Sequence, residues 1–128
     1  MTRARLLVLG AATLLVFSVA TLARGGAPKK PDNERVEAAK AMFNAVKAGF
    51  EAGTGTLDAV YLWSVRWLTA QQEPGTAARA PACAAHLARM RALETTVGGR
   101  VRQGLATRTD SLAAAYYRAE AEHWARRP

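Results

Sequence analysis

The chain has 128 residues, of which 50% are hydrophobic and 22% are charged, and alanine dominates the apolar class. This composition excludes a disordered chain or a disulfide-rich scaffold and favours one all-α domain. Lysine and arginine number 18 against 10 acidic residues, giving a net charge of +8, and the single cysteine, Cys83, excludes an intrachain disulfide.

The N-terminal segment has the pattern of an export signal. Arg3 and Arg5 form a basic start, and an uncharged, mostly apolar run of 18 residues follows from Leu6 to Ala23. The apolar run of a cleaved signal peptide usually spans about 7 to 15 residues, whereas about 18 or more can cross a bilayer. Residues 1–23 are therefore expected to be a signal peptide or a signal anchor, with cleavage favoured. Either outcome predicts an exported protein, in the periplasm or anchored in the membrane and facing the periplasm.

Residues 24–33 are predicted to be a flexible linker because they contain two prolines, two glycines and two lysines. A first helix is predicted from Glu34 to Ala52, since apolar residues recur there at alternating spacings of three and four. The resulting apolar face consists of Val36, Ala39, Phe43, Val46 and Phe50.

A tight turn is predicted at Gly53-Thr54-Gly55-Thr56. Gly53 is placed to end the first helix in the left-handed conformation, and Thr56 is placed to cap the next helix. Asp58 adds a negative charge to the first turn of that helix, where the helix dipole favours acids.

A second helix is predicted over residues 57–73, and the short turn makes residues 34–73 an antiparallel helical hairpin. This helix is apolar on nearly every side, with Ser64 and Arg66 as the only polar residues in its middle. One partner helix cannot bury such a surface. The second helix is therefore expected to lie at the centre of a bundle or to offer a surface to another chain.

Residues 74–81 are predicted to be a connector, and a third helix is predicted over residues 82–103. The stretch Thr95-Thr96-Val97-Gly98-Gly99 combines β-branched residues with two glycines. Each glycine costs about 1 kcal/mol relative to alanine in a helix. A kink or local fraying is therefore expected at residues 95–99.

Gly104 is placed to end the third helix, and Thr107 with Asp110 resembles a capping box that starts a fourth helix. The inner face of this helix is predicted to consist of Leu112, Tyr116, Ala119 and His123, flanked by Tyr117 and Trp124. Residues 82–128 thus form a second hairpin. The two hairpins are expected to pack as a small four-helix bundle or as an elongated pair.

The two turns repeat one another at a spacing of 51 to 52 residues. In each turn a helix ends at glycine, and the next helix restarts with threonine and aspartate ahead of an apolar residue. These positions are Gly53, Thr56, Asp58 and Val60 in the first turn and Gly104, Thr107, Asp110 and Leu112 in the second. The runs Thr69-Ala70-Gln71 and Ala119-Glu120-Ala121 follow.

This repeated turn resembles the helical hairpin segments of TolC-type outer-membrane efflux proteins. The resemblance implies a coiled-coil-like hairpin that docks on an envelope assembly, such as an efflux assembly. The family's channel also needs alternating barrel strands, and this sequence contains no such stretch. A transport pore is therefore not implied.

The usual catalytic signatures are absent from the sequence, which has no glycine-rich phosphate loop, nucleophile elbow or Cys-x-x-Cys pair. We therefore predict that the protein is not an enzyme and uses no cofactor. One constellation of chemical interest joins Cys83-x-x-His86 with Glu120-x-x-His123. In an antiparallel hairpin these four side chains could meet and bind a metal, whereas packing of the histidines in a core or an interface is the simpler interpretation.

Two further residue groups are candidates for binding. Aromatic residues could form an interface or a ligand pocket, although residues at helical spacing usually belong to a core. These candidates are Tyr61, Trp63, Trp67 and Trp124, together with the pair Tyr116-Tyr117. Residues 82–128 carry eight basic and four acidic side chains. A face for anionic lipid or nucleic acid would need to bring together Arg89, Arg91, Arg100, Arg102 and Arg108.

The sequence leaves three functions open. The favoured one is a non-catalytic structural or interaction module of the bacterial envelope, whose partner is another envelope protein or a second copy of the chain. Residues 1–23 would add contact with the membrane if they are not cleaved. The alternatives are a helical bundle that binds a small ligand or a metal, and a basic helical module that binds anionic lipid or nucleic acid. Export removes most nucleic acid from reach.

Overall fold

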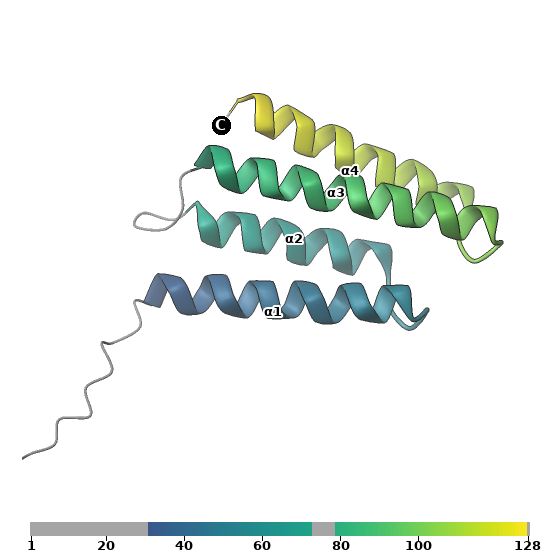
Figure 1. Cartoon of the computed structure of the whole chain (residues 1–128), viewed down its shortest axis with the longest axis horizontal. Coiled ribbons are helices and arrows are strands. Elements are labelled where there is room, and N and C mark those ends of the chain that lie inside the picture. The colour runs from purple at the N-terminus through teal and green to yellow at the C-terminus, as the bar shows by residue number, and fades with distance from the viewer. Residues whose placement is uncertain (1–30, 73–78, 128) are drawn as a thin grey trace, which may run out of the picture.

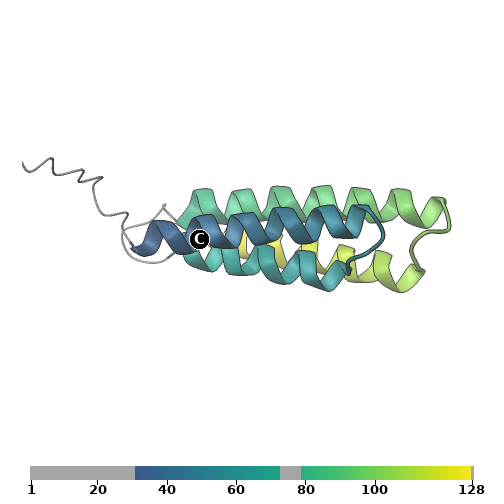
Figure 2. The same cartoon turned by 90° about the horizontal axis from the view of Figure 1, so that it is seen from below.

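The computed structural model describes residues 31–72 and 79–127, and these residues form four α-helices and no strand. The helices are α1 (Pro31–Glu51), α2 (Leu57–Gln71), α3 (Arg79–Arg102) and α4 (Arg108–Arg126). They run alternately up and down, so the α1–α2 and α3–α4 turns lie at the same end of an elongated bundle (Figure 1, Figure 2). The predicted all-α fold of two helical hairpins is confirmed, whereas residues 1–23 lie outside the described residues.

α1 buries the predicted apolar face against the rest of the bundle. Its five members, Val36, Ala39, Phe43, Val46 and Phe50, are all buried or half-buried. The rings of Phe43 and Trp67, on α2, lie 5.6 Å apart between centres. α1 begins three residues earlier than predicted, because Pro31 needs no amide hydrogen bond in the first turn of a helix. Residues 31–33 are therefore helical and do not belong to the linker predicted over residues 24–33.

α2 is the central helix, since it contacts α1, α3 and α4. The outermost helices are α1 and α4 (Figure 1), whose Cα atoms nowhere approach within 8 Å in the described residues. One apolar cluster joins all four helices and contains Phe43, Phe50, Leu57, Val60, Met90, Leu93, Val97, Ala114 and Ala121. None of the described helices is both long and apolar enough to span a membrane.

α3 starts earlier than expected and contains no break. Pro81 lies in its first turn, where proline is tolerated, so residues 79–81 are helical rather than part of the connector predicted over residues 74–81. The local fraying expected at residues 95–99 does not occur, because α3 runs as one helix to Arg102, and that part of the prediction is wrong.

The physical reason is packing in the middle of that stretch. Val97 is completely buried in the shared apolar cluster. The hydroxyls of Thr95 and Thr96 donate to carbonyl oxygens one turn earlier, at 3.1 and 3.0 Å. Tertiary contacts therefore outweigh the low helix propensity of the two glycines, as they do for most helices in proteins.

α4 presents a different face to the bundle from the one predicted. Leu112 and Tyr116 are 60% and 62% exposed, and Ala119 and His123 are also exposed. The face turned to α3 and α2 carries Ala114, Tyr117, Ala121 and Trp124 instead. Alanine at the contact lets two helix backbones approach closely, so α4 packs through its small residues and leaves its larger apolar residues outside.

The two turns have the same backbone geometry. Gly53 and Gly104 have φ angles of 80° and 73°, values that L-residues adopt only at a cost. The amides of Gly53 and Gly104 each donate to the carbonyl three residues earlier at 3.0 Å. The hydroxyls of Thr56 and Thr107 each accept from the amide three residues later. The structural repeat is therefore 51 residues at each of these positions.

The carboxylates next to the two caps differ in their contacts. Asp110 completes a capping box, because its Oδ2 accepts from the Thr107 amide at 2.7 Å. These hydrogen bonds from Thr107 hold the pKa of Asp110 below its usual value. Asp58, in the first turn of α2, instead accepts a hydrogen bond from Tyr117 on α4.

Candidate functional site

A cluster of three polar side chains lies between the two hairpins, and we call Ser64, His86 and Arg89 the polar seam. Ser64 is the small hydroxyl residue on the apolar helix α2, and His86 and Arg89 lie one turn apart on α3. Ser64 Oγ lies 2.8 Å from His86 Nδ1, and Arg89 Nε donates to the same oxygen at 2.7 Å. Arg89 Nη2 also donates to the Ser64 carbonyl at 3.3 Å. The seam therefore ties the first hairpin to the second.

His86 is a neutral ring in the interior. Both Ser64 and His86 have 0% exposed surface, and the imidazole stacks on Trp124 of α4 with 5.5 Å between ring centres. Burial lowers the pKa of His86 to about 4, and the positive charge of Arg89 lowers it further in the same direction. Because Arg89 can only donate, Ser64 accepts from it and can give its own proton to Nδ1, which places the ring proton on Nε2.

Arg89 is a partly buried cation whose neighbours are aromatic. Its guanidinium carbon lies 4.1 Å from the ring centre of Trp67 and 5.6 Å from that of Phe43. Burial lowers its pKa to about 10, so the side chain stays charged at neutral pH. Aromatic faces attract a cation by about 0.5 to 2 kcal/mol. Here the two rings stabilise the charge of Arg89, as a carboxylate often does for a buried arginine.

The contact between Ser64 and His86 has the residue types of a nucleophile and its base. Such a pair needs access to a substrate and usually a third group that orients the base. Neither side chain has exposed surface, and Nε2 of His86 finds no hydrogen-bond partner among the described residues. In this conformation the contacts of the polar seam hold α2 against α3.

The four residues of the predicted metal constellation do not converge. Cys83 is buried and accepts a hydrogen bond from Gln72 Nε2 at 3.3 Å, while His86 belongs to the seam. Glu120 accepts a hydrogen bond from Tyr61, and His123 is exposed on the outside of α4. Within residues 31–72 and 79–127, no three ligand-type side chains are grouped to hold a metal ion.

A pair of tyrosines joins α2 to α4. The rings of Tyr61 and Tyr117 stack with 3.9 Å between centres and 8° between planes. The Tyr61 hydroxyl donates to Glu120, and the Tyr117 hydroxyl donates to Asp58 at 2.6 Å. Burial and then the bond to Glu120 raise the pKa of Tyr61, while burial and then the bond to Asp58 raise the pKa of Tyr117 to about 12. Each hairpin thus supplies one tyrosine and one carboxylate.

The arginines expected on one basic face point in different directions. That face would have joined Arg89, Arg91, Arg100, Arg102 and Arg108. Arg89 turns into the seam, and Arg100 turns towards α1, where its Nη1 donates to the Glu51 carbonyl at 3.3 Å. The guanidinium of Arg100 also lies 4.9 Å from the ring centre of Phe50. Two of the five cations are therefore committed to packing between the hairpins.

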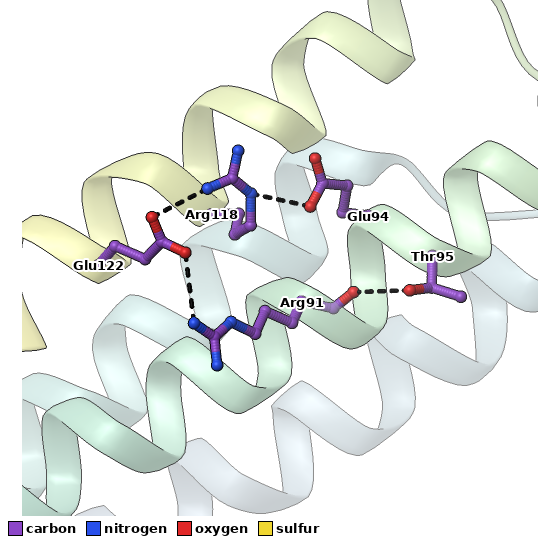
Figure 3. Close-up of polar contacts among 5 residues, drawn as sticks. All are labelled: Arg91, Glu94, Thr95, Arg118 and Glu122. Carbon is purple, nitrogen blue, oxygen red and sulfur yellow. Dashed lines mark hydrogen bonds and ion pairs between the residues drawn. The ribbon is translucent and has the colours of Figure 1, made fainter.

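Arg91 turns the other way, into an ionic network between α3 and α4 (Figure 3). Its Nη2 lies 3.3 Å from Glu122, and Arg118 contacts both Glu122 and Glu94 at 2.9 Å. The hydrogen bonds from Arg91 and Arg118 lower the pKa of Glu122. This network pairs charges across the second hairpin, so Arg91 does not share a face with Arg89 and Arg100.

The candidate aromatic residues are half-buried and mostly contact other parts of the bundle. Trp67 and Trp124 pack against the seam, and Tyr61 stacks on Tyr117. Trp63 lies beside Arg66, whose guanidinium carbon is 4.6 Å from its ring centre. Both line an open groove of about 370 Å³ between α1 and α2, whose other lining residues are Arg35, Ala38, Ala39, Thr69 and Ala70.

The outward face of α4 exposes large apolar side chains on one stripe of the helix. We define the outer stripe as Thr109, Leu112, Tyr116, Ala119, His123 and Arg126, all of which are exposed. The leucine and the tyrosine are among the most exposed large apolar side chains of the described residues, at 60% and 62%. The informative feature of a surface is an exposed group of large apolar side chains rather than a single one.

Sequence reasoning missed the seam and the tyrosine pair. The available signal for the seam was a lone serine on an apolar helix, together with a histidine and an arginine three residues apart on another helix. For the tyrosines it was the presence of one carboxylate three residues before or after each ring, at Asp58 and Glu120. Neither signal states which helices become neighbours.

No protein-family model matches the sequence, and no curated protein or solved structure is significantly similar to it.

Proposed function

We propose that this chain is a non-catalytic helical interaction module of the bacterial envelope, exported by its N-terminal segment, and that it binds a protein partner through the outer stripe of α4. The observation that carries the proposal is the exposure of Leu112 and Tyr116 at heptad-like spacing. An exposed apolar stripe on a helix is the usual means by which one helix recognises another chain.

The rest of the bundle supports this choice of surface. The polar groups with catalytic character, Ser64 and His86, have no exposed surface. Three of the five arginines of α3 are divided between the seam, α1 and the network with α4, namely Arg89, Arg100 and Arg91. The outer stripe places two of the most exposed large apolar side chains of the described residues, Leu112 and Tyr116, on one helix face, and burial of apolar surface is the main favourable term in protein association.

The compartment follows from the N-terminal pattern of two arginines and an 18-residue apolar run. The turn pattern centred on Gly53 and Gly104 supports docking near an efflux-type assembly, by resemblance to the hairpins of TolC-type proteins. The lone cysteine is buried, so partner binding uses packing rather than a disulfide.

The test is site-specific photo-crosslinking in cells, combined with fractionation. The photoreactive residue p-benzoyl-phenylalanine replaces Tyr116 in the full chain, and a matched variant carries it at Ala45, an exposed residue of α1. We expect a protein adduct from position 116, in the envelope fraction, and none from position 45. The adduct should disappear when Leu112→Asp is added.

Two results would contradict the proposal. A chain found only in the cytosol removes the envelope assignment. Equal adducts from positions 116 and 45, or an adduct that survives Leu112→Asp, removes the outer stripe as the binding surface.

A further inference from the structure

We infer that the outer stripe binds a second copy of this chain, with α4 packed antiparallel on α4 about a two-fold axis. The inference rests on the proposed function, because it takes the outer stripe as the binding surface and adds the identity of the partner. It comes from the order of residues along the stripe, which is complementary to its own reverse.

The outer stripe has the spacing of a coiled-coil seam. Its members, Thr109, Leu112, Tyr116, Ala119, His123 and Arg126, follow one another at intervals of three, four, three, four and three. This alternation keeps side chains facing one partner helix along the whole length of α4. The inner face of α4 is already occupied by α2 and α3, and none of the other described helices covers the outer stripe, so a second chain can pack on it.

Antiparallel pairing matches the largest side chain of the stripe, Tyr116, to the smallest, Ala119. The centre of the stripe lies between Tyr117 and Arg118, and reversal about that point places Tyr116 opposite Ala119 of the second copy. The same reversal places Leu112 opposite His123. A large residue against a small one fills the space between two helices without voids or overlap. Parallel pairing would instead set Tyr116 against Tyr116 and Ala119 against Ala119, with crowding at one level and a gap at the next.

Charge also favours the antiparallel arrangement. The last turn of α4 carries Arg126 and the residue after it is Arg127, whereas the first turn carries one base, Arg108, and one acid, Asp110, whose charges balance. Antiparallel pairing keeps the four C-terminal arginines two at each end, each pair beside one Arg108 of the other copy. Parallel pairing would gather all four at one end. Opposed helix dipoles add to the same preference.

One helix-to-helix contact is a small interface. Weak and transient complexes bury less than about 1,200 Å² in total, and stable ones usually bury more. We therefore expect a dimer that dissociates in the micromolar range and exchanges with monomer. Local concentration at an envelope surface would favour the dimer.

The decisive experiment is disulfide trapping between two differently tagged full-length chains in cells. Both chains carry Cys83→Ala, which removes a buried thiol; one also carries Leu112→Cys and the other carries His123→Cys. We expect the 112–123 disulfide to form at least tenfold more than the 112–112 disulfide, because the two positions 112 lie about 16 Å apart in the antiparallel dimer. A pair with Ala45→Cys is the matched control and should not be trapped.

A second measurement uses the purified full chain in sedimentation velocity. Leu112→Asp should weaken dimerisation at least tenfold, whereas Met42→Asp, at an exposed apolar residue of α1 that is 40% exposed, should leave it unchanged. Thermal unfolding monitored by circular dichroism shows whether each variant keeps its fold.

The outcomes separate this inference from the proposed function. Trapping of 112–112 in preference to 112–123 overturns the antiparallel arrangement. A monomeric parent chain, together with a Tyr116 photo-adduct to a different protein, overturns the second copy and leaves the interaction module standing. Absence of both the disulfide and the adduct overturns the two together.

Discussion

Ser64, His86 and Arg89 are polar and lie inside the bundle, whereas Leu112 and Tyr116 are large and apolar and lie outside it. In the polar seam, contacts of 2.7 and 2.8 Å to the Ser64 hydroxyl oxygen offset the cost of burying polar side chains. On the outer stripe, Leu112 and Tyr116 remain 60% and 62% exposed, and the Tyr116 hydroxyl donates to Glu120 of the same helix at 3.3 Å.

This contrast assigns the polar seam to the stability of the fold and the outer stripe to binding. A buried polar group is costly unless it is paired, so substitutions in the seam should act on the free energy of unfolding. An exposed apolar side chain contributes little to the folded monomer, so substitutions on the outer stripe should act on association.

The largest expected effect is the pH dependence contributed by His86. Its pKa is about 4 when folded and about 6.5 in the unfolded chain. Between these values the unfolded chain binds more protons, so stability falls as the pH drops from 6.5 to 4 and is fully present above 6.5. The total loss is about 3 kcal/mol, since each pKa unit is worth about 1.4 kcal/mol.

Urea unfolding at several pH values measures this loss. His86→Asn keeps a polar group near Ser64 and cannot be protonated in this range, so it should flatten the slope of stability against pH. The same slope in the parent and in His86→Asn would show that His86 is not a buried neutral ring.

Ser64→Ala should cost about 1 to 3 kcal/mol. The substitution removes one oxygen and leaves Nδ1 of His86 and Nε of Arg89 without a partner in the interior. Chemical denaturation measures the change, and Thr69→Ala on the exposed side of the same helix is the control. A loss no larger than that of the control would mean that the seam does not hold the hairpins together.

Gly104, in the turn between α3 and α4, should tolerate alanine less well than Gly98, which lies within α3. Gly104→Ala is expected to destabilise by about 1 to 2 kcal/mol, because its φ of 73° is unfavourable for L-residues. Gly98→Ala is expected to stabilise by up to about 1 kcal/mol, since an added Cβ lies 3.7 Å from the Arg102 side chain, an ordinary contact. Thermal unfolding of the two variants should therefore shift in opposite directions, and shifts of equal sign contradict the turn geometry.

The smallest effect on stability is expected on the outer stripe. Leu112→Ala should change the free energy of unfolding by less than about 0.5 kcal/mol, as surface substitutions usually do. Chemical denaturation at a concentration where the chain is monomeric measures it. A loss above about 1 kcal/mol would show that Leu112 packs within the monomer, and the division between seam and stripe would then fail.

Local features were readable from the sequence because their energetics involve only a few neighbouring residues. Gly53 and Gly104 take positive φ, and Thr56 and Thr107 cap the helices that follow. A left-handed glycine and a capping hydroxyl depend on backbone conformation within one turn. The apolar face of α1 was equally plain, since its helix has a single stripe of large residues.

The inward face of α4 could not be predicted from local patterns. Its sequence contains two stripes at helical spacing, one with Leu112 and Tyr116 and the other with Ala114 and Tyr117. Periodicity treats them alike. The stripe with Ala114 and Tyr117 faces inward for two reasons. Its alanines allow α3 to approach closely, and Tyr117 stacks on Tyr61 of α2.

The seam depended on tertiary structure to a still greater degree. Ser64 and its partners are 22 and 25 residues apart in the chain, and no local pattern states that these positions become neighbours. The sequence by itself determined where helices end and restart, because that energy is local. Which polar groups are buried together, and which apolar face of α4 is left for another chain, was decided only when four helices had to fill one interior.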